Sequence, residues 1–122
     1  MPEAHRVLIV DDNQELVRAA ALRLRAAGYE TLAAFDGEQG VATAVERHPD
    51  AIVLDVRMPN KDGLSALAEL QATDATRAIP VIMLSASIID EQAALQAGAR
   101  YFLKKPYDSG KLLSALATAM RN

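Results

Sequence analysis

The chain has 122 residues, 51% of them hydrophobic, a length that fits one domain with its own core. Its net charge of −3 argues against the basic face of a nucleic-acid-binding domain, and the lack of cysteine excludes disulfides and cysteine-based zinc sites. The start of the chain does not resemble a signal peptide, and its apolar runs are far shorter than the roughly 18 residues of a membrane span. We therefore expect one cytoplasmic domain over residues 1–122 that binds neither nucleic acid nor membrane.

Apolar runs of strand length alternate with helical patterns five times along the chain. The expected strands are 6–10, 30–35, 51–55, 80–84 and about 100–103. The expected helices are 13–27, 37–48, 63–73, 88–97 and 109–121. Repeated strand–helix units predict an α/β fold, because right-handed crossovers place the helices on both faces of a parallel sheet. We expect a doubly wound five-stranded parallel sheet in the flavodoxin-like order 2-1-3-4-5, with five helices.

Two of the expected helices show a clear apolar face. The first places Leu16, Ala20, Leu24 and Ala27 on one side and ends at Gly28, a plausible C-terminal cap. In the last, the shared face consists of Leu112, Leu113, Leu116, Ala117 and Met120.

Polar residues follow the apolar runs where three of the strands end. Asp11 and Asp12 follow the first strand, Asp55 ends the third, and Ser85 follows the fourth. Ligands of doubly wound sheets bind beyond the carboxyl ends of strands 1 and 3, so the three aspartates are expected to meet there. Lys105 leaves the fifth strand at the same edge.

Three carboxylates held close together repel one another, so either some of them are protonated or a cation lies among them. Mg²⁺, or Mn²⁺ in its place, suits oxygen ligands and completes its shell with waters and phosphate oxygens. A carboxylate can also accept a phosphoryl group. The pattern therefore suggests Asp55 as the nucleophile and Asp11 and Asp12 as metal ligands, while Lys105 and Ser85 contact the phosphoryl oxygens.

Over nearly its whole length, the chain resembles the receiver domain of bacterial response regulators, including the chemotaxis regulators. The matching segments are Ile9-Val10-Asp11-Asp12, Val53-Leu54-Asp55-Val56-Arg57-Met58-Pro59, Asp62-Gly63, Leu84-Ser85-Ala86, Gly98-Ala99 and Lys105-Pro106. The resemblance implies a signalling domain that catalyses only its own phosphorylation and dephosphorylation. Its phosphoryl donor would be a histidine kinase or a histidine phosphotransfer domain, and Asp55 would be the acceptor.

The same resemblance implies further roles. The backbone carbonyl of Arg57 would be a metal ligand beside Asp11, Asp12 and Asp55. Ser85 would be the switch hydroxyl, and Phe102 falls at the position of the switch aromatic. Phosphorylation would repack the face formed by the last two helices and the strand between them, which would contact a downstream protein or a fused effector domain, or form a phosphorylation-dependent dimer.

The chain departs from the receiver pattern after the fourth strand. Only 13 positions separate Ser85 from Gly98, so either the loop or the helix there is expected to be short. Ile88 and Ile89 are consecutive, and we expect one of them to be exposed as a partner contact.

Three alternatives are open on the residues alone. A flavodoxin-like cofactor binder would share the fold, but Asp11 and Asp12 would repel its phosphate. An aspartyl-phosphate hydrolase commonly has a second acid two residues after its nucleophile, where this chain has Arg57. A receiver that signals by protein binding alone is the third alternative, and the complete acid cluster argues against it.

Overall fold

Five parallel strands form one sheet in the order β2-β1-β3-β4-β5 in the computed structural model, which describes residues 5–121. The strands are β1 (Arg6–Val10), β2 (Glu30–Ala34), β3 (Ala51–Asp55), β4 (Val81–Ser85) and β5 (Tyr101–Lys104). The helices are α1 (Gln14–Ala26), α2 (Gly37–Arg47), α3 (Gly63–Ala72), α4 (Asp90–Gln96) and α5 (Ser109–Met120). The predicted flavodoxin-like fold is confirmed. Residues 1–4 and 122 of the predicted domain lie outside the described range.

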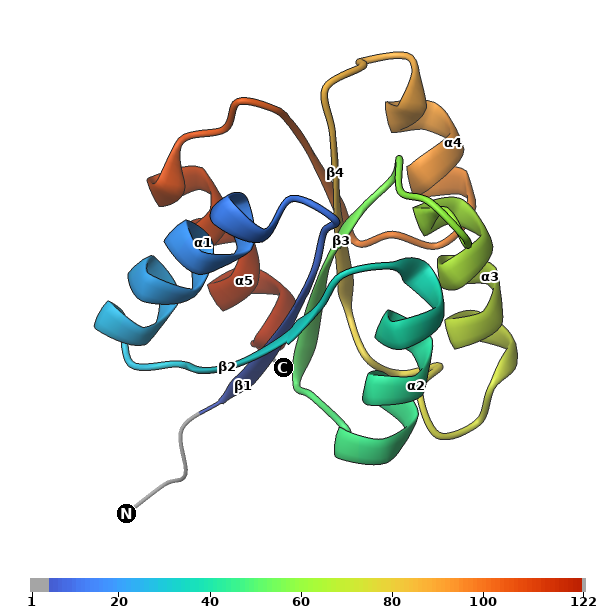
Figure 1. Cartoon of the computed structure of the whole chain (residues 1–122), viewed down its shortest axis with the longest axis horizontal. Coiled ribbons are helices and arrows are strands. Elements are labelled where there is room, and N and C mark those ends of the chain that lie inside the picture. The colour runs from blue at the N-terminus through green and yellow to red at the C-terminus, as the bar shows by residue number, and fades with distance from the viewer. Residues whose placement is uncertain (1–4, 122) are drawn as a thin grey trace.

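Helices cover both faces of the sheet: α1 and α5 lie on one side, and α2, α3 and α4 on the other (Figure 1). The central strands are buried on both faces, and their side chains alternate between the two cores. In β3, Ile52 and Leu54 pack into the core beneath α3, whereas Ala51 and Val53 pack beneath α1 and α5. Within residues 5–121, no helix has the length and apolar character needed to cross a membrane.

The apolar faces of α1 and α5 are rotated slightly from the predicted ones. Leu16 is 45% exposed, and Val17 is buried in its place. On α5, Ala117 is exposed and Ala119 is buried. The faces differ at these positions because the side that meets the sheet depends on the angle at which the helix docks, which spacing alone does not set. Gly28 follows the C-cap of α1 with a φ of 99°, as expected of a capping glycine.

The stretch after β4 is short because α4 itself is short. This helix has seven residues and begins at Asp90, two residues later than predicted. Ile88 is 57% exposed and Ile89 is 82% exposed, so both isoleucines reach solvent where only one was expected to. Both lie in the turn before α4, outside the helix whose geometry suggested that one would be buried.

Candidate functional site

The carboxyl ends of β1 and β3 lie side by side and bring the predicted aspartates together. The parallel register pairs Val10 with Leu54, so the next residues along the two strands are Asp11 and Asp55. One carboxylate oxygen from each of Asp11, Asp12 and Asp55 lies within 4.8 Å of the others. Asp11 and Asp55 are 4% and 5% exposed, while Asp12 faces solvent. The cluster thus has two buried acids and one at its mouth.

Lys105 reaches into this cluster from the segment that follows β5. Its Nζ lies 2.7 Å from Oδ2 of Asp11 and 3.3 Å from Oδ1 of Asp55. Its backbone N–H donates to the Ser85 carbonyl at 2.8 Å, and this bond ties the segment to the end of β4. One cation therefore serves two buried carboxylates, and the negative charge of the cluster exceeds the positive charge within it.

This imbalance is visible in the pKa of Asp55. Burial, together with the charge of Asp11, raises the pKa of Asp55 from its ordinary 3.8 to about 6, although Lys105 opposes the change. Burial alone would lower the pKa of Lys105, but its hydrogen bond and charge interaction with Asp11, reinforced by Asp55, outweigh burial and raise it. Lys105 therefore stays protonated at neutral pH, whereas the Asp55 carboxylate is ionised at a cost in free energy.

Asn13, rather than either aspartate, caps α1. Its side-chain oxygen accepts hydrogen bonds from the backbone N–H groups of Glu15 and Leu16, at 3.1 and 3.2 Å. Asp11 supports this turn by accepting from the Asn13 N–H at 3.0 Å. Capping therefore does not explain why two aspartates follow β1.

The loop after β3 folds back onto the end of its own strand. The N–H of Gly63 donates to the Val56 carbonyl at 2.7 Å. A Cβ atom at Gly63 would lie 2.0 Å from the backbone oxygen of Asp55, so only glycine fits this approach. Asp62 caps α3 by accepting from the Ser65 N–H at 2.8 Å. The Asp62-Gly63 pair of the sequence pattern thus holds the loop against the site.

Ser85 is buried beside this loop, where its hydroxyl bonds to a residue that the sequence analysis missed. Its Oγ donates to Oδ2 of Asp90 at 2.5 Å and accepts from the Ser87 N–H at 3.1 Å. Asp90 also receives two hydrogen bonds from the Arg57 guanidinium, each 3.1 Å long. The Ser85 hydrogen bond, followed by Arg57, lowers the pKa of Asp90 despite its burial.

Phe102 lies half-buried on β5, opposite Met83 of β4 in the register. It packs against the core cluster that contains Ala94 of α4, whereas its neighbour Tyr101 packs against the cluster on the other face of the sheet. Because neighbouring strand residues point to opposite faces, Phe102 is the one of this pair that lies on the α4 side.

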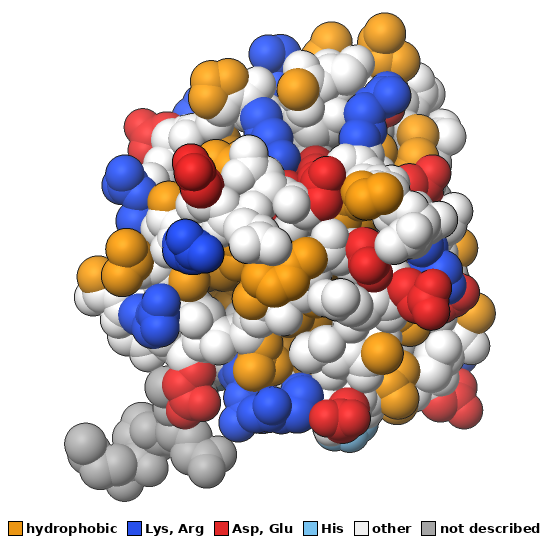
Figure 2. Space-filling view, viewed as in Figure 1, with side chains coloured by type: hydrophobic (Ala, Val, Ile, Leu, Met, Phe, Trp, Pro, Cys, Tyr) orange, Lys and Arg blue, Asp and Glu red, His pale blue; other side chains and the backbone are white. Residues whose placement is uncertain are grey.

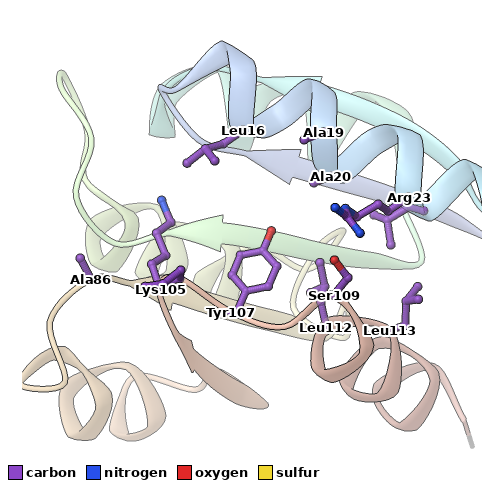
Figure 3. A pocket seen from close by; sticks show the side chains of 12 residues that line it. Leu16, Ala19, Ala20, Arg23, Ala86, Lys105, Tyr107, Ser109, Leu112 and Leu113 are labelled. Carbon is purple, nitrogen blue, oxygen red and sulfur yellow. The ribbon is translucent and has the colours of Figure 1, made fainter.

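A cavity of about 400 Å³ adjoins the site between α1 and α5. Figure 3 shows Tyr107 pointing across it toward α1, beside Lys105. Burial raises the pKa of Tyr107. Leu16, Ala20 and Leu112 make much of the wall apolar, so the cavity does not extend the carboxylate cluster.

The donor set at the sheet edge fits a hard divalent cation. Three carboxylates offer oxygen ligands at mutual distances that one ion can span, and one of them is exposed to admit it. A bound cation would also balance the charge that raises the pKa of Asp55. Mg²⁺ prefers such a partial oxygen shell and keeps waters in its remaining positions.

Comparison with known proteins agrees with this arrangement. The family model of the response regulator receiver domain matches residues 7–117. The transcriptional regulatory protein PrrA of Mycobacterium tuberculosis is 40% identical over 118 residues, which are 95% of this chain and 50% of PrrA. The response regulator PleD of Caulobacter vibrioides is 37% identical over 95% of the chain and 26% of its own length. The chain thus spans half or less of these relatives.

Solved structures share the fold across nearly the whole chain. A putative response regulator from Chloroflexus aurantiacus superposes with a TM-score of 0.92 at 31% identity, covering 97% of this chain and 98% of its own. The receiver domain of the sensor histidine kinase PA1611 from Pseudomonas aeruginosa has a TM-score of 0.88 at 34% identity, covering 96% and 98%. That domain holds a magnesium ion in its active-site cleft.

Proposed function

Because this chain belongs to the response regulator receiver domain family of two-component signalling, we propose that Asp55 accepts a phosphoryl group from a phosphohistidine. The donor is a histidine kinase or a histidine phosphotransfer domain. The observation that carries the proposal is the setting of Asp55, a buried carboxylate beside a second buried acid and within 3.3 Å of a lysine ammonium. Asp11 is also buried beside this lysine, but its two oxygens already accept hydrogen bonds from the Asn13 N–H at 3.0 Å and from Lys105 at 2.7 Å.

In this reaction, an oxygen of Asp55 bonds to phosphorus while the bond from phosphorus to the donor imidazole breaks, and the electron pair leaves with the imidazole. Lys105 balances charge on the phosphoryl oxygens, and the Ser85 hydroxyl hydrogen-bonds to one of them. Asp11, Asp12 and Asp55, with the backbone carbonyl of Arg57, would hold Mg²⁺ or Mn²⁺. When bound, this cation neutralises part of the negative charge on the transferring group.

The domain catalyses only its own phosphorylation and dephosphorylation, and its output is a change of surface. Phosphorylation draws Ser85 toward the phosphoryl group and lets Phe102 repack, which alters the face made by α4, β5 and α5. This face contacts a downstream protein, a fused effector domain or a second copy of the chain. A cytoplasmic location stays a prediction.

Labelling with acetyl phosphate and Mg²⁺ tests the proposal. Intact-mass analysis should find one added phosphoryl group on the wild-type protein and none on Asp55→Asn. Asp74→Asn is the matched control, because its side chain is 89% exposed and lies outside the cluster. A phosphoryl group on Asp55→Asn would refute the assignment. An unlabelled wild-type protein would instead favour the receiver that signals by protein binding alone.

A further inference from the structure

Asp90 is a buried carboxylate that the proposed phosphoryl transfer does not use. It is 8% exposed, stands at the start of α4, and accepts the hydrogen bonds of both Ser85 and Arg57. Ser85 is the last residue of β4, and Arg57 lies two residues beyond the end of β3; the two strands are neighbours in the sheet, and β3 ends at Asp55. Asp90 therefore connects the site to α4, across the shortened stretch of the chain.

We propose that Asp90 is a positioning residue that takes the place of the phosphoryl group in the unphosphorylated protein. Its carboxylate holds the Ser85 hydroxyl and the Arg57 guanidinium, and phosphorylation of Asp55 draws these donors away and releases the start of α4. This inference rests on the proposed phosphorylation of Asp55 and adds the group with which the phosphoryl group competes.

The competition at Ser85 follows from the number of hydrogens on its side chain. A hydroxyl has one hydrogen to donate, and Ser85 donates it to Asp90 at 2.5 Å. The oxygen of Ser85 accepts from the Ser87 N–H at 3.1 Å. A phosphoryl group on an aspartate offers acceptor oxygens, so Ser85 can bind it only by giving up Asp90. Ser85 can therefore donate to Asp90 or to the phosphoryl group, but not to both.

The geometry of the ion pair between Arg57 and Asp90 allows Arg57 to exchange Asp90 for another anion. Both bonds to Asp90 are 3.1 Å long and form a two-pronged contact, yet the Arg57 side chain is 69% exposed. Solvent therefore screens the Arg57 end of the pair. Asp90 is buried, so once its donors leave it must move toward solvent to avoid the cost of an unpaired buried charge. Arg57 lies two residues after Asp55, so a phosphoryl group there would bring a competing charge of about −2 and would also repel the Asp90 carboxylate.

Release of Asp90 would act directly on the surface in front of α4. Four residues, 86–89, join β4 to this helix, and Ile89 at the N-cap makes no side-chain cap bond within the described chain. Hydrophobic side chains stand exposed over the β4–α4 connection (Figure 2), where Ile88 and Ile89 are 57% and 82% exposed. Loss of the Asp90 bonds would free the short connection and so change the positions of these two exposed isoleucines.

Binding of beryllofluoride, a phosphoryl mimic, in the presence of Mg²⁺ tests the competition. Asp90→Asn keeps the shape of the side chain but removes its charge, and we expect it to bind the mimic about three- to tenfold more tightly than wild type. Asp90→Glu keeps the carboxylate and should return toward the wild-type affinity. Glu91→Gln is the matched control on the same helix turn, because Glu91 makes no ion pair within residues 5–121, and it should bind as wild type does.

Equal or weaker binding by a folded Asp90→Asn, with normal binding by wild type, would overturn the role of Asp90 and leave the proposed function standing. A wild-type protein that takes up neither beryllofluoride nor a phosphoryl group would overturn both.

A second measurement uses the unaltered protein, in case Asp90→Asn does not fold. The carboxylate ¹³C resonance of Asp90 should shift when Mg²⁺ and beryllofluoride saturate the site, because its hydrogen bonds are lost. Amide exchange at residues 88–91 should become faster at the same time. An unchanged Asp90 resonance at saturation would contradict the proposal.

Discussion

Replacing Asp55 by asparagine should stabilise the metal-free protein at neutral pH, although it removes the residue on which the proposed function depends. The pKa of Asp55 is raised from 3.8 to about 6, mainly by burial and then by Asp11. Since a difference of one in pKa corresponds to about 1.4 kcal/mol, ionised Asp55 lowers the free energy of unfolding by at most about 3 kcal/mol. We expect a gain of about 1–2 kcal/mol in Asp55→Asn, because solvent reaches the open edge of the site and the amide is a weaker partner for Lys105.

The gain should depend on pH in a defined direction. Since the raised pKa belongs to an acid, the folded state binds more protons than the unfolded state between pH 3.8 and about 6. Wild-type stability therefore falls, relative to Asp55→Asn, as the pH rises through this window, and the full difference remains above it. The advantage of the variant should be largest at pH 7.5, smaller at pH 5, and nearly absent below about pH 4.

Urea unfolding in EDTA at these three pH values measures the difference directly. Asp74→Asn controls for the loss of an exposed aspartate and should change stability little. Added Mg²⁺ should then stabilise wild type more than Asp55→Asn, because a cation that binds the folded state raises its stability. The reasoning is refuted if Asp55→Asn is no more stable than wild type at pH 7.5, or if its advantage does not shrink in acid.

Three further variants address other parts of the site, and a fourth, at Gly28, is a control. Asp12→Asn should weaken stabilisation by Mg²⁺ but leave the stability of the metal-free protein nearly unchanged, since this acid is exposed. If Mg²⁺ raises the melting temperature of the variant as much as that of wild type, Asp12 is not a metal ligand. Lys105→Ala should abolish the response of amide exchange across 86–113 to a phosphoryl mimic, and a normal response would show that the lysine is not part of the switch. Gly63→Ala should cost about 3 kcal/mol or more in urea unfolding, because its Cβ would lie 2.0 Å from a backbone oxygen. Gly28→Ala, where a Cβ meets no described atom within 4 Å, should cost only about 1–2 kcal/mol for its positive φ, and equal costs would contradict the clash.

Much of the architecture was predictable because it follows from short-range patterns. A continuous apolar run such as residues 51–54 indicates a strand buried on both faces, and the alternation of such runs with helices leaves few topologies. Parallel strands end at one edge, so Asp11 and Asp55 could be placed together before their distances were known.

The errors concern features that depend on how the elements dock. Spacing predicted an apolar face on α1, but contact with the sheet buries Val17 and leaves Leu16 in solvent. Likewise, the step of 13 positions from Ser85 to Gly98 indicated a shortened segment without showing whether the loop or the helix was shorter. The structure starts α4 at Asp90, and this start brings the carboxylate back to Ser85 and across to Arg57.

The sequence by itself therefore determined the fold and which polar residues lie at the ends of the strands. Both follow from the order and spacing of apolar residues over short stretches of the chain. Only the tertiary structure decided the partners of those residues. Lys105 pairs with two acids that lie far from it in the chain, and these contacts, together with burial, set the pKa of Asp55. The bonds of Asp90 cross the irregular turn after β4 and reach the loop after β3. Such contacts depend on burial and on the path of the loops, and neither produces a repeating pattern in the amino-acid sequence.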